Sequence, residues 1–229
     1  MTSIGIITYS NQKYEWMLPW WTHHLQLHTP FPIAYIDNGL SDKMKQWCID
    51  KGTLIPFTSQ IDIKPKESIS LTLQKQWESQ YFGNVWLNRL SWHVKPEILR
   101  LSPFDITLYL DIDCEVKKPI FELFHIDHEF AICEEPLGKA RYNSGVILYN
   151  KNSKVLDLWH ERSQRENHLY MGDEDLLSEI LEEQSNMYIT LNSQYNCRPK
   201  SENQDSASII HHVGLGGKRD IMASILEIF

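Results

Sequence analysis

The sequence lacks the features that mark several classes of protein. No apolar run approaches the ~18–20 residues needed to cross a bilayer. The first ten residues carry no basic segment ahead of their short apolar run, so we expect neither a transmembrane segment nor a signal peptide. Acidic residues outnumber basic ones, 30 against 22, and this net charge of −8 disfavours nucleic acid and anionic membrane as partners. Glycine-rich phosphate loops of the Walker or Rossmann type are also missing.

Cysteine is scarce, which bears on the compartment. The four cysteines (Cys48, Cys114, Cys133 and Cys197) form no CxxC pair. We therefore interpret them as reduced thiols and expect a cytoplasmic protein. The remaining composition, 42% hydrophobic and 23% charged, excludes a disordered or fibrous chain. The length of 229 residues predicts a single domain over 1–229 with a substantial core.

Short apolar runs alternate with helical patterns along the chain. We expect strands at 4–7, 33–36, 53–57, 106–110, 130–133, 146–149, 188–191 and 209–213. We expect helices at 14–27, 41–51, 71–91 with a break near Gly83, 152–165 and 174–183. This order predicts an α/β fold on a mostly parallel sheet. Ligands of such sheets bind beyond the carboxyl ends of the strands.

Two aspartates follow the strongest of these runs. Asp111 and Asp113 come directly after 106–110, and residues i and i+2 of an extended chain point to the same side. Two carboxylates held together repel each other unless a cation lies between them. Mg²⁺ or Mn²⁺ suits such oxygen ligands and leaves coordination positions for phosphate. The alternative interpretation is a solvated strand end with two capping acids.

Five segments carry a wider resemblance. They are 109–113 (YLDID), 142–150 (YNSGVILYN), 172–177 (GDEDLL), 191–196 (LNSQYN), and 209–214 (IIHHVG) with Lys218 after it. In this order they resemble the glycosyltransferases of the GT-A fold, above all the family of glycogenin and the bacterial lipopolysaccharide α-galactosyltransferases (glycosyltransferase family 8). The likeness extends over about residues 4–218. It implies a single Rossmann-like nucleotide-sugar-binding domain.

The resemblance also implies a reaction. Such enzymes move a hexose from a UDP-sugar, commonly UDP-glucose or UDP-galactose, to a hydroxyl of a glycan, a protein or a small molecule. Two alternatives stay open: an inactive nucleotide-sugar-binding protein of the same fold, and a sugar nucleotidyltransferase. The second normally carries an early glycine-rich basic loop, which residues 8–11 do not form.

The resemblance assigns a metal site. It implies that Asp111 and Asp113 hold Mn²⁺ (or Mg²⁺) against the diphosphate of the donor, with His211 as the third protein ligand. His212 stands where the family usually has Tyr or Phe, so it remains an alternative ligand. Carboxylates combined with an imidazole suit Mn²⁺ better than Ca²⁺.

A lysine after a glycine-rich stretch is the candidate phosphate contact. Lys218 follows Gly214, Gly216 and Gly217, which let a backbone approach an anion, and the resemblance implies that it contacts the diphosphate. A solvated lysine on a flexible loop is the alternative. The chain has Arg219-Asp220 where the family often has Pro-Trp.

Further residues are assigned to the donor by the same likeness. Thr8 and Tyr9 would contact the uracil and ribose, and Asn143 and Ser144 the donor sugar. Ordinary strand-end and turn residues are the alternatives. Lys95 and Ile112 complete the expected donor contacts; they lie in the segment before the metal motif and between its two aspartates.

The acids of 173–175 are the candidate catalytic groups, together with Asn143. Acids at a helix start are favoured by the helix dipole and by capping, which is the simpler interpretation. In the resembling family this triplet is usually Asp-Gln-Asp, and its first two residues lie near the reacting sugar carbon. Asp173 matches, whereas Glu174 replaces the Gln. A carboxylate there could act as nucleophile or base, or stabilise an oxocarbenium-like charge. The family favours retention of anomeric configuration.

The acceptor side is less defined by the sequence. Gln194 and Asn196 are candidates for the acceptor pocket. Trp86 and Trp92 could form an aromatic platform for an acceptor, although packing in the core is the alternative for each.

Overall fold

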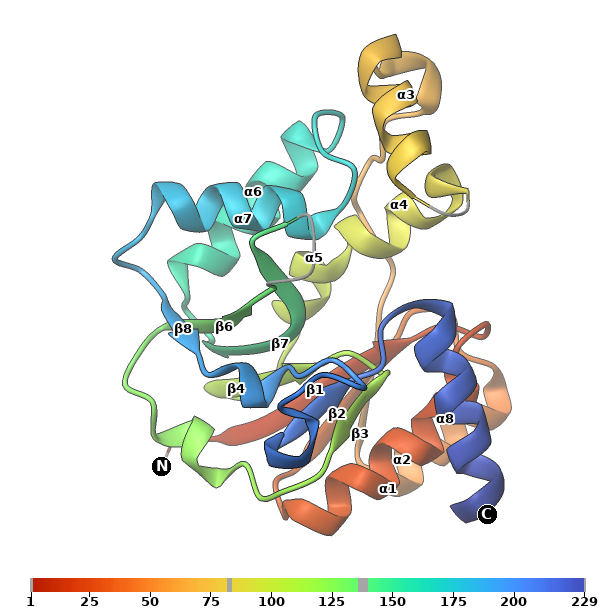
Figure 1. Cartoon of the computed structure of the whole chain (residues 1–229), viewed down its shortest axis with the longest axis vertical. Coiled ribbons are helices and arrows are strands. Elements are labelled where there is room, and N and C mark those ends of the chain that lie inside the picture. Colours follow the sequence, from red (N-terminus) through yellow and green to blue (C-terminus); the bar gives the residue numbers. More distant parts are fainter. Residues whose placement is uncertain (1, 82–83, 136–139, 229) are drawn as a thin grey trace.

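A seven-stranded sheet with the order β3-β2-β1-β4-β7-β6-β8 forms the core of residues 2–81, 84–135 and 140–228, which the computed structural model describes (Figure 1). Its strands are β1 (Ile4–Ser10), β2 (Ile33–Asp37), β3 (Thr53–Pro56), β4 (Ile106–Leu110), β6 (Phe130–Glu134), β7 (Tyr142–Asn150) and β8 (Ile189–Leu191). β7 is antiparallel to β4 and β6, and the other neighbouring pairs are parallel. The expected α/β fold on a mostly parallel sheet is confirmed.

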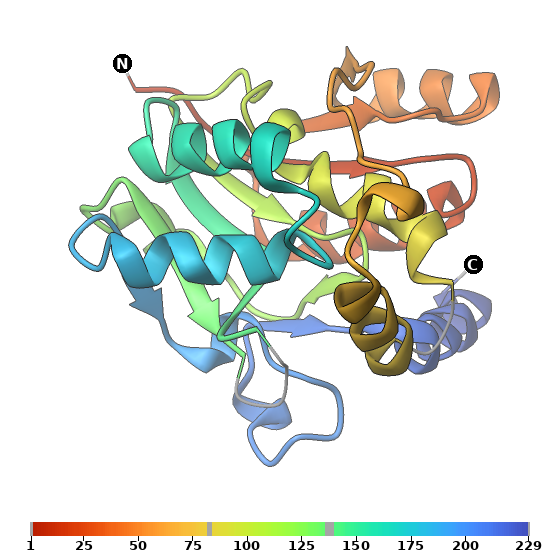
Figure 2. The ribbon, with the colours of Figure 1, turned by 90° about the horizontal axis from the view of Figure 1, so that it is seen from above.

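Helices cover both faces of the sheet (Figures 1 and 2). One face carries α1 (Leu18–His28), α2 (Asp42–Lys51) and α8 (Gly214–Ile228), and the other α5 (Lys95–Leu99), α6 (Lys154–Glu166) and α7 (Asp173–Glu183). The alternation of strand side chains divides the core between these layers. Ile6 and Leu108 pack with Trp20 of α1. Ile7, the next residue of β1, packs in the second core with Trp159 of α6.

A helical pair, α3 (Leu71–Gln80) and α4 (Val85–His93), projects beside α5 (Figure 1). The sequence predicted one interrupted helix over 71–91, and the structure has two. Ser70 and Asn84 begin them, because their side-chain oxygens accept from the backbone N–H of Leu73 and Trp86. The expected break at Gly83 lies outside the described residues. Short 3₁₀ turns occur at Glu15–Met17, Lys66–Ser68, Phe121–His125, Ser193–Tyr195 and Gln204–Ser206.

A second, two-stranded sheet follows the carboxyl end of β4, the central strand of the first. It pairs β5 (Cys114–Val116) with β9 (Ile209–His211) in antiparallel register, and Cys114 lies opposite His211. The sequence predicted a strand near 209 but none at 114–116. This small sheet joins the segment after β4 to the segment before α8, two parts of the chain that lie far apart in sequence.

The helix α8 was not predicted. We interpreted the glycines before Lys218 as backbone that can approach an anion, with a flexible loop as the alternative, but Gly214–Ile228 is helical and Lys218 lies in it. A Cβ on Gly217 would lie 2.0 Å from the carbonyl oxygen of His212, so only glycine lets the helix start this close to the preceding backbone. The glycines therefore serve the packing of a helix.

Two observations concern the compartment. All four cysteines are buried and none is bonded to another. None of the helices in the described part of the chain combines the length and the apolar character needed to cross a bilayer. The cytoplasmic location stays a prediction.

Candidate active site

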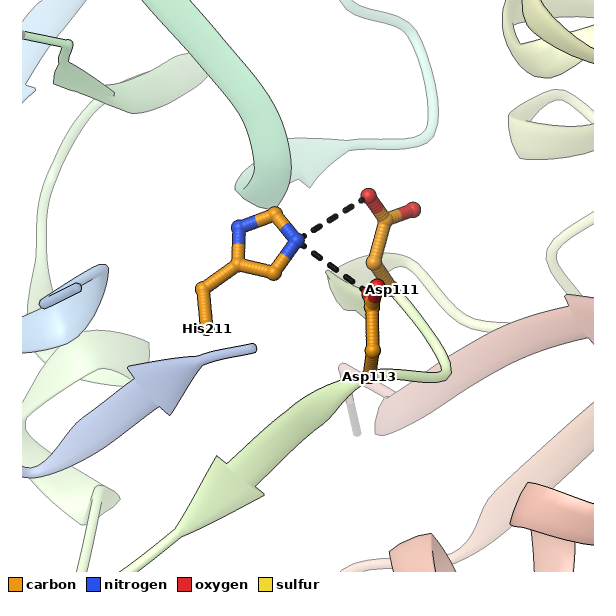
Figure 3. A group of neighbouring side chains, drawn as sticks. All are labelled: Asp111, Asp113 and His211. Atoms are coloured by element: carbon orange, nitrogen blue, oxygen red, sulfur yellow. Dashed lines mark ion pairs between the residues drawn. The ribbon is translucent and has the colours of Figure 1, made fainter. Parts of the chain in front are cut away.

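Asp111, Asp113 and His211 form a cluster at the end of β4 (Figure 3). His211 Nε2 lies 3.2 Å from Asp113 Oδ1 and 3.6 Å from Asp111 Oδ2. One ligand atom from each residue lies within 4.8 Å of the others, a spacing that fits one divalent cation. Two carboxylate oxygens and an imidazole nitrogen are a donor set that suits Mn²⁺.

A turn brings the two carboxylates together. We expected Asp111 and Asp113 to share one side of an extended strand, but β4 ends at Leu110. The backbone N–H of Asp111 donates to Gly145 O (2.8 Å), and that of Cys114 donates to Asp111 O (2.9 Å). The chain therefore turns at the motif. This turn, and not an extended strand as we predicted, brings the two carboxylates together.

Hydrogen bonds fix the ring of His211. Its Nδ1 lies 3.0 Å from Asn143 Oδ1 and 2.9 Å from Asn196 Oδ1. Since both partners are amide oxygens that only accept, Nδ1 donates to them, and Nε2 is the ring nitrogen that faces the aspartates. His212 is directed elsewhere, with its Nε2 3.0 Å from Glu115 Oε2. Of the two histidines, His211 is thus the one placed to bind a metal.

Gly145 is a site residue that our candidate set omitted. A Cβ at this position would lie 2.1 Å from Cε1 and 2.5 Å from Nδ1 of His211. The imidazole therefore occupies the space that a side chain at 145 would need. The sequence predicted the strand only from residue 146, whereas β7 starts at Tyr142 and includes Gly145. A glycine within a strand often marks the close approach of another group, so the correct start of the strand would have supplied the signal.

β7 reaches the cluster through a bulge. Ile147 pairs with Ile132 of β6, but the next pair is Asn143 with Cys133, so residues 144–146 are extra on β7. Such bulges redirect side chains. Asn143 and Ser144 therefore lie in the strand rather than in a turn before it, and both line the cleft.

Lys95 links the aspartate cluster to the start of α7. It is buried on α5, with its Nζ 3.2 Å from Asp111 Oδ1 and 3.5 Å from Asp173 Oδ2. It also donates to Ser144 Oγ (2.7 Å), which donates in turn to Asp173 (2.7 Å). Burial alone would lower the pKa of Lys95, but the carboxylates of Asp111 and Asp173 outweigh it and raise that pKa. Lys95 is thus a permanent buried cation.

Lys218 holds the other side of the cluster. Its Nζ donates to Asp113 Oδ2 at 2.9 Å. Burial would raise the pKa of Asp113, but His211 and Lys218 outweigh burial and hold this pKa well below its usual range. Asp113 is therefore ionised and ready to bind a cation.

The three acids of α7 have different surroundings. The Asp175 carboxylate accepts from Gly172 N (3.3 Å) and so caps its own helix. Glu174 Oε1 instead accepts from Asn143 Nδ2 (2.9 Å) and Ser144 N (3.1 Å). Burial, together with the neighbouring Asp173 carboxylate, raises the pKa of Glu174 to about 8. The capping interpretation thus holds for the third acid alone.

These groups line one cleft of about 460 Å³, within the usual range for a small-molecule site of ~300–1,000 Å³. The cleft brings together the predicted Tyr9, Lys95, Asp111, Ile112, Asp113, Asn143, Ser144, Asp173, Glu174, His211 and Lys218. Thr8 is buried and does not line it. Nor does Gln194, whereas Asn196 reaches the site through His211.

Solved structures share the fold that carries this cleft. The chain is similar to the glycosyltransferase GlyE of Streptococcus pneumoniae TIGR4, with a TM-score of 0.59 and 16% identity over 93% of this chain and 56% of GlyE. It is similar to the galactosyltransferase LgtC, solved with donor and acceptor sugar analogues, with a TM-score of 0.57 and 16% identity over 96% of this chain and 95% of LgtC. It is also similar to mouse xyloside xylosyltransferase 1, with a TM-score of 0.57 and 14% identity over 91% of this chain and 97% of the mouse enzyme.

The expected GT-A glycosyltransferase fold is therefore confirmed. The chain spans little more than half the length of GlyE and 46% of the bifunctional glycosyltransferase WbbM, another similar structure. No protein-family model and no curated protein matches the sequence.

Proposed function

We propose that this chain is a metal-dependent glycosyltransferase that moves a hexose from a UDP-sugar to an acceptor hydroxyl. The observation that carries the proposal is the Asp111–Asp113–His211 cluster, placed between two lysines in the cleft of a GT-A fold. UDP-glucose and UDP-galactose are the donors we propose first. The acceptor is a glycan, a protein or a small molecule.

The residues of the cluster suit a diphosphate. Asp111, Asp113 and His211 would hold Mn²⁺ or Mg²⁺, which offsets the charge of the departing UDP when bound. Lys218 is within reach of the same oxygens, since it already contacts Asp113 at 2.9 Å. Tyr9, whose ring stacks at 6.0 Å on that of Tyr109, forms the part of the cleft proposed for the nucleoside.

Glu174 is the residue we propose at the reacting carbon. Its Oε1 is fixed by Asn143 and Ser144, whereas its Oε2 has no hydrogen-bond partner among the described residues. An ionised Oε2 can act as nucleophile, or can accept the proton of the acceptor hydroxyl. A nucleophilic role gives two displacements and thus retention, the outcome we favour. Asp173, held by Ser144 and Lys95, orients this part of the site.

Release of UDP from UDP-glucose and UDP-galactose tests the proposal, measured with Mn²⁺ and with EDTA. We expect Mn²⁺-dependent release with at least one donor and almost none from Asp113→Asn, because that change removes a charged ligand without changing the size of the side chain. Asp50→Asn, at an exposed aspartate of α2, is the matched control. Release that persists in EDTA or in Asp113→Asn contradicts the metal assignment. No release, with no thermal shift by UDP plus Mn²⁺, overturns the function.

A further inference from the structure

The cleft extends beyond the groups assigned to the donor, onto the α3–α4 pair. This wall consists of Tyr81, Asn88, Ser91, Trp92, Met171 and Gly172. None of these residues belongs to the carboxylate and lysine cluster. We infer that the wall is a subsite for the pyranose ring of a carbohydrate acceptor, with the indole of Trp92 as its platform. The inference rests on the proposed function, since it assigns the acceptor of that same site.

The chemistry of the wall matches one face of a sugar. A pyranose presents an apolar face of C–H groups and a rim of hydroxyls, so it needs an aromatic surface next to a polar group. The rings of Tyr81 and Trp92 meet edge to face at 5.0 Å and remain partly exposed. Asn88 donates from Nδ2 to Asn84 O (3.0 Å), while its Oδ1 accepts no hydrogen bond from the described residues. That oxygen is available to a sugar hydroxyl.

Trp92 lies against the residue that precedes the catalytic candidates. A Cβ on Gly172 would be 3.3 Å from Trp92 Cε3, so the indole covers the backbone of Gly172. Asp173 and Glu174 follow directly. The wall and the two acids thus line one continuous cleft, in which an acceptor on the wall and a donor on the cluster can both be held. Tyr9 closes the donor side, since its hydroxyl donates to Ser91 O at 3.0 Å.

A buried arginine holds this wall in place. Arg89 of α4 is 1% exposed and donates to the carbonyl oxygens of Lys64 (2.9 Å), Asn167 and Tyr170 (3.4 Å). No carboxylate pairs with it in the described part of the chain, and its guanidinium lies 5.0 Å from the ring centre of Trp77. α4 is therefore fixed to the segment that leads into α7. A preformed wall loses little conformational entropy when a ligand binds.

The aromatic residues of α4 supply a matched pair of variants. Trp92 lines the cleft, whereas Trp86 does not; its indole donates to Glu78 (2.7 Å) and packs on Trp77. We would compare Trp92→Leu with Trp86→Leu, and check the fold of both by thermal unfolding. Asn88→Leu removes the free amide oxygen while it keeps the branched shape and the number of heavy atoms of the side chain, and gives a second, milder variant.

The assay is UDP release with Mn²⁺, using methyl β-galactopyranoside and methyl β-glucopyranoside as acceptor probes. We expect a glycoside to stimulate release by the unaltered chain. Trp92→Leu should raise the KM for the glycoside roughly five- to tenfold, the worth of one aromatic contact. Trp86→Leu, whose side chain does not line the cleft, should behave like the unaltered chain both in this KM and in slow donor hydrolysis without acceptor.

Three results separate the possibilities. Donor hydrolysis that no glycoside stimulates overturns the subsite but leaves the proposed function standing. The same holds if Trp92→Leu and Trp86→Leu raise the KM equally, or if neither Trp92→Leu nor Asn88→Leu changes it. Absence of any UDP release, with no binding of UDP plus Mn²⁺, overturns both.

Discussion

Substituting Gly145 by alanine should move His211 away from the aspartates. The new Cβ would lie 2.1 Å from Cε1 and 2.5 Å from Nδ1 of His211, and 2.9 Å from Oδ1 of Asn143. Since carbon atoms rest at about 3.5–4.0 Å, the ring must shift by about 1.5 Å. The backbone of β7 cannot yield instead, because Gly145 O accepts from Asp111 and Val146 pairs with Leu110.

The consequence is measurable as metal affinity and as stability. Displacing Nε2 from Asp111 and Asp113 should weaken Mn²⁺ binding by at least about 10–100-fold, the usual cost of disturbing a ligand's support. The crowding itself should lower the free energy of unfolding by about 1–3 kcal/mol. Titration calorimetry with Mn²⁺ and UDP measures the first effect, and urea unfolding without metal measures the second.

Two comparisons isolate the cause. Gly216→Ala places its methyl group in open space, without a positive φ, so Mn²⁺ affinity should not change. In a His211→Ala background the ring is gone, and the stability cost of Gly145→Ala should largely disappear. A folded Gly145→Ala chain that binds Mn²⁺ normally, or an undiminished cost in the His211→Ala background, refutes the steric reasoning.

Other predictions concern the charges. Lys95→Met leaves Asp111 and Asp173 without their shared cation, so it should lower the free energy of unfolding in urea by about 3 kcal/mol. Lys154→Met, at an exposed lysine, is the control, and an equal loss in the two variants would count against the prediction. With the pKa of Glu174 raised to about 8, the rate of sugar transfer should rise with pH up to about 8, and Glu174→Gln should abolish that rise. Between about pH 4.5 and 8 the folded carboxyl keeps a proton that the unfolded one releases, so its contribution to stability should fall as pH rises. Buried His93, with its pKa lowered to about 3, contributes in the opposite direction up to about pH 6.5, so the unaltered chain is compared with Glu174→Gln, and a stability difference that does not change with pH would contradict the raised pKa.

Local patterns predicted those elements whose cause is local. The run 106–110 became β4 because its β-branched and aromatic residues suit a buried strand. The helix expected at 41–51 begins after Ser41, whose Oγ accepts from Met44 N, and ends before Gly52. In each case the residues that decide the structure are neighbours in sequence.

The features that the sequence did not reveal depend on distant contacts. β5 has only three residues and exists because β9 pairs with it. The start of α8 is set by contact between Gly217 and the backbone of His212, and the spacing of apolar residues along the sequence does not reveal such a contact. Thr8 was assigned from the family pattern, yet its side chain is enclosed by the core. The metal motif was recognised, but its turn depends on a hydrogen bond to Gly145 that the motif does not contain.

The position of β9 and α8 along the chain also sets the order in which the molecule can be built. The last strand of the large sheet, β8, ends at Leu191, whereas His211 and Lys218 are translated afterwards. A nascent chain thus contains the residues of every strand of the large sheet and both aspartates before the third candidate ligand is added. Pairing of β9 with β5 is the step that delivers His211, so binding of a divalent ion by all three ligands reports that the late segment has docked.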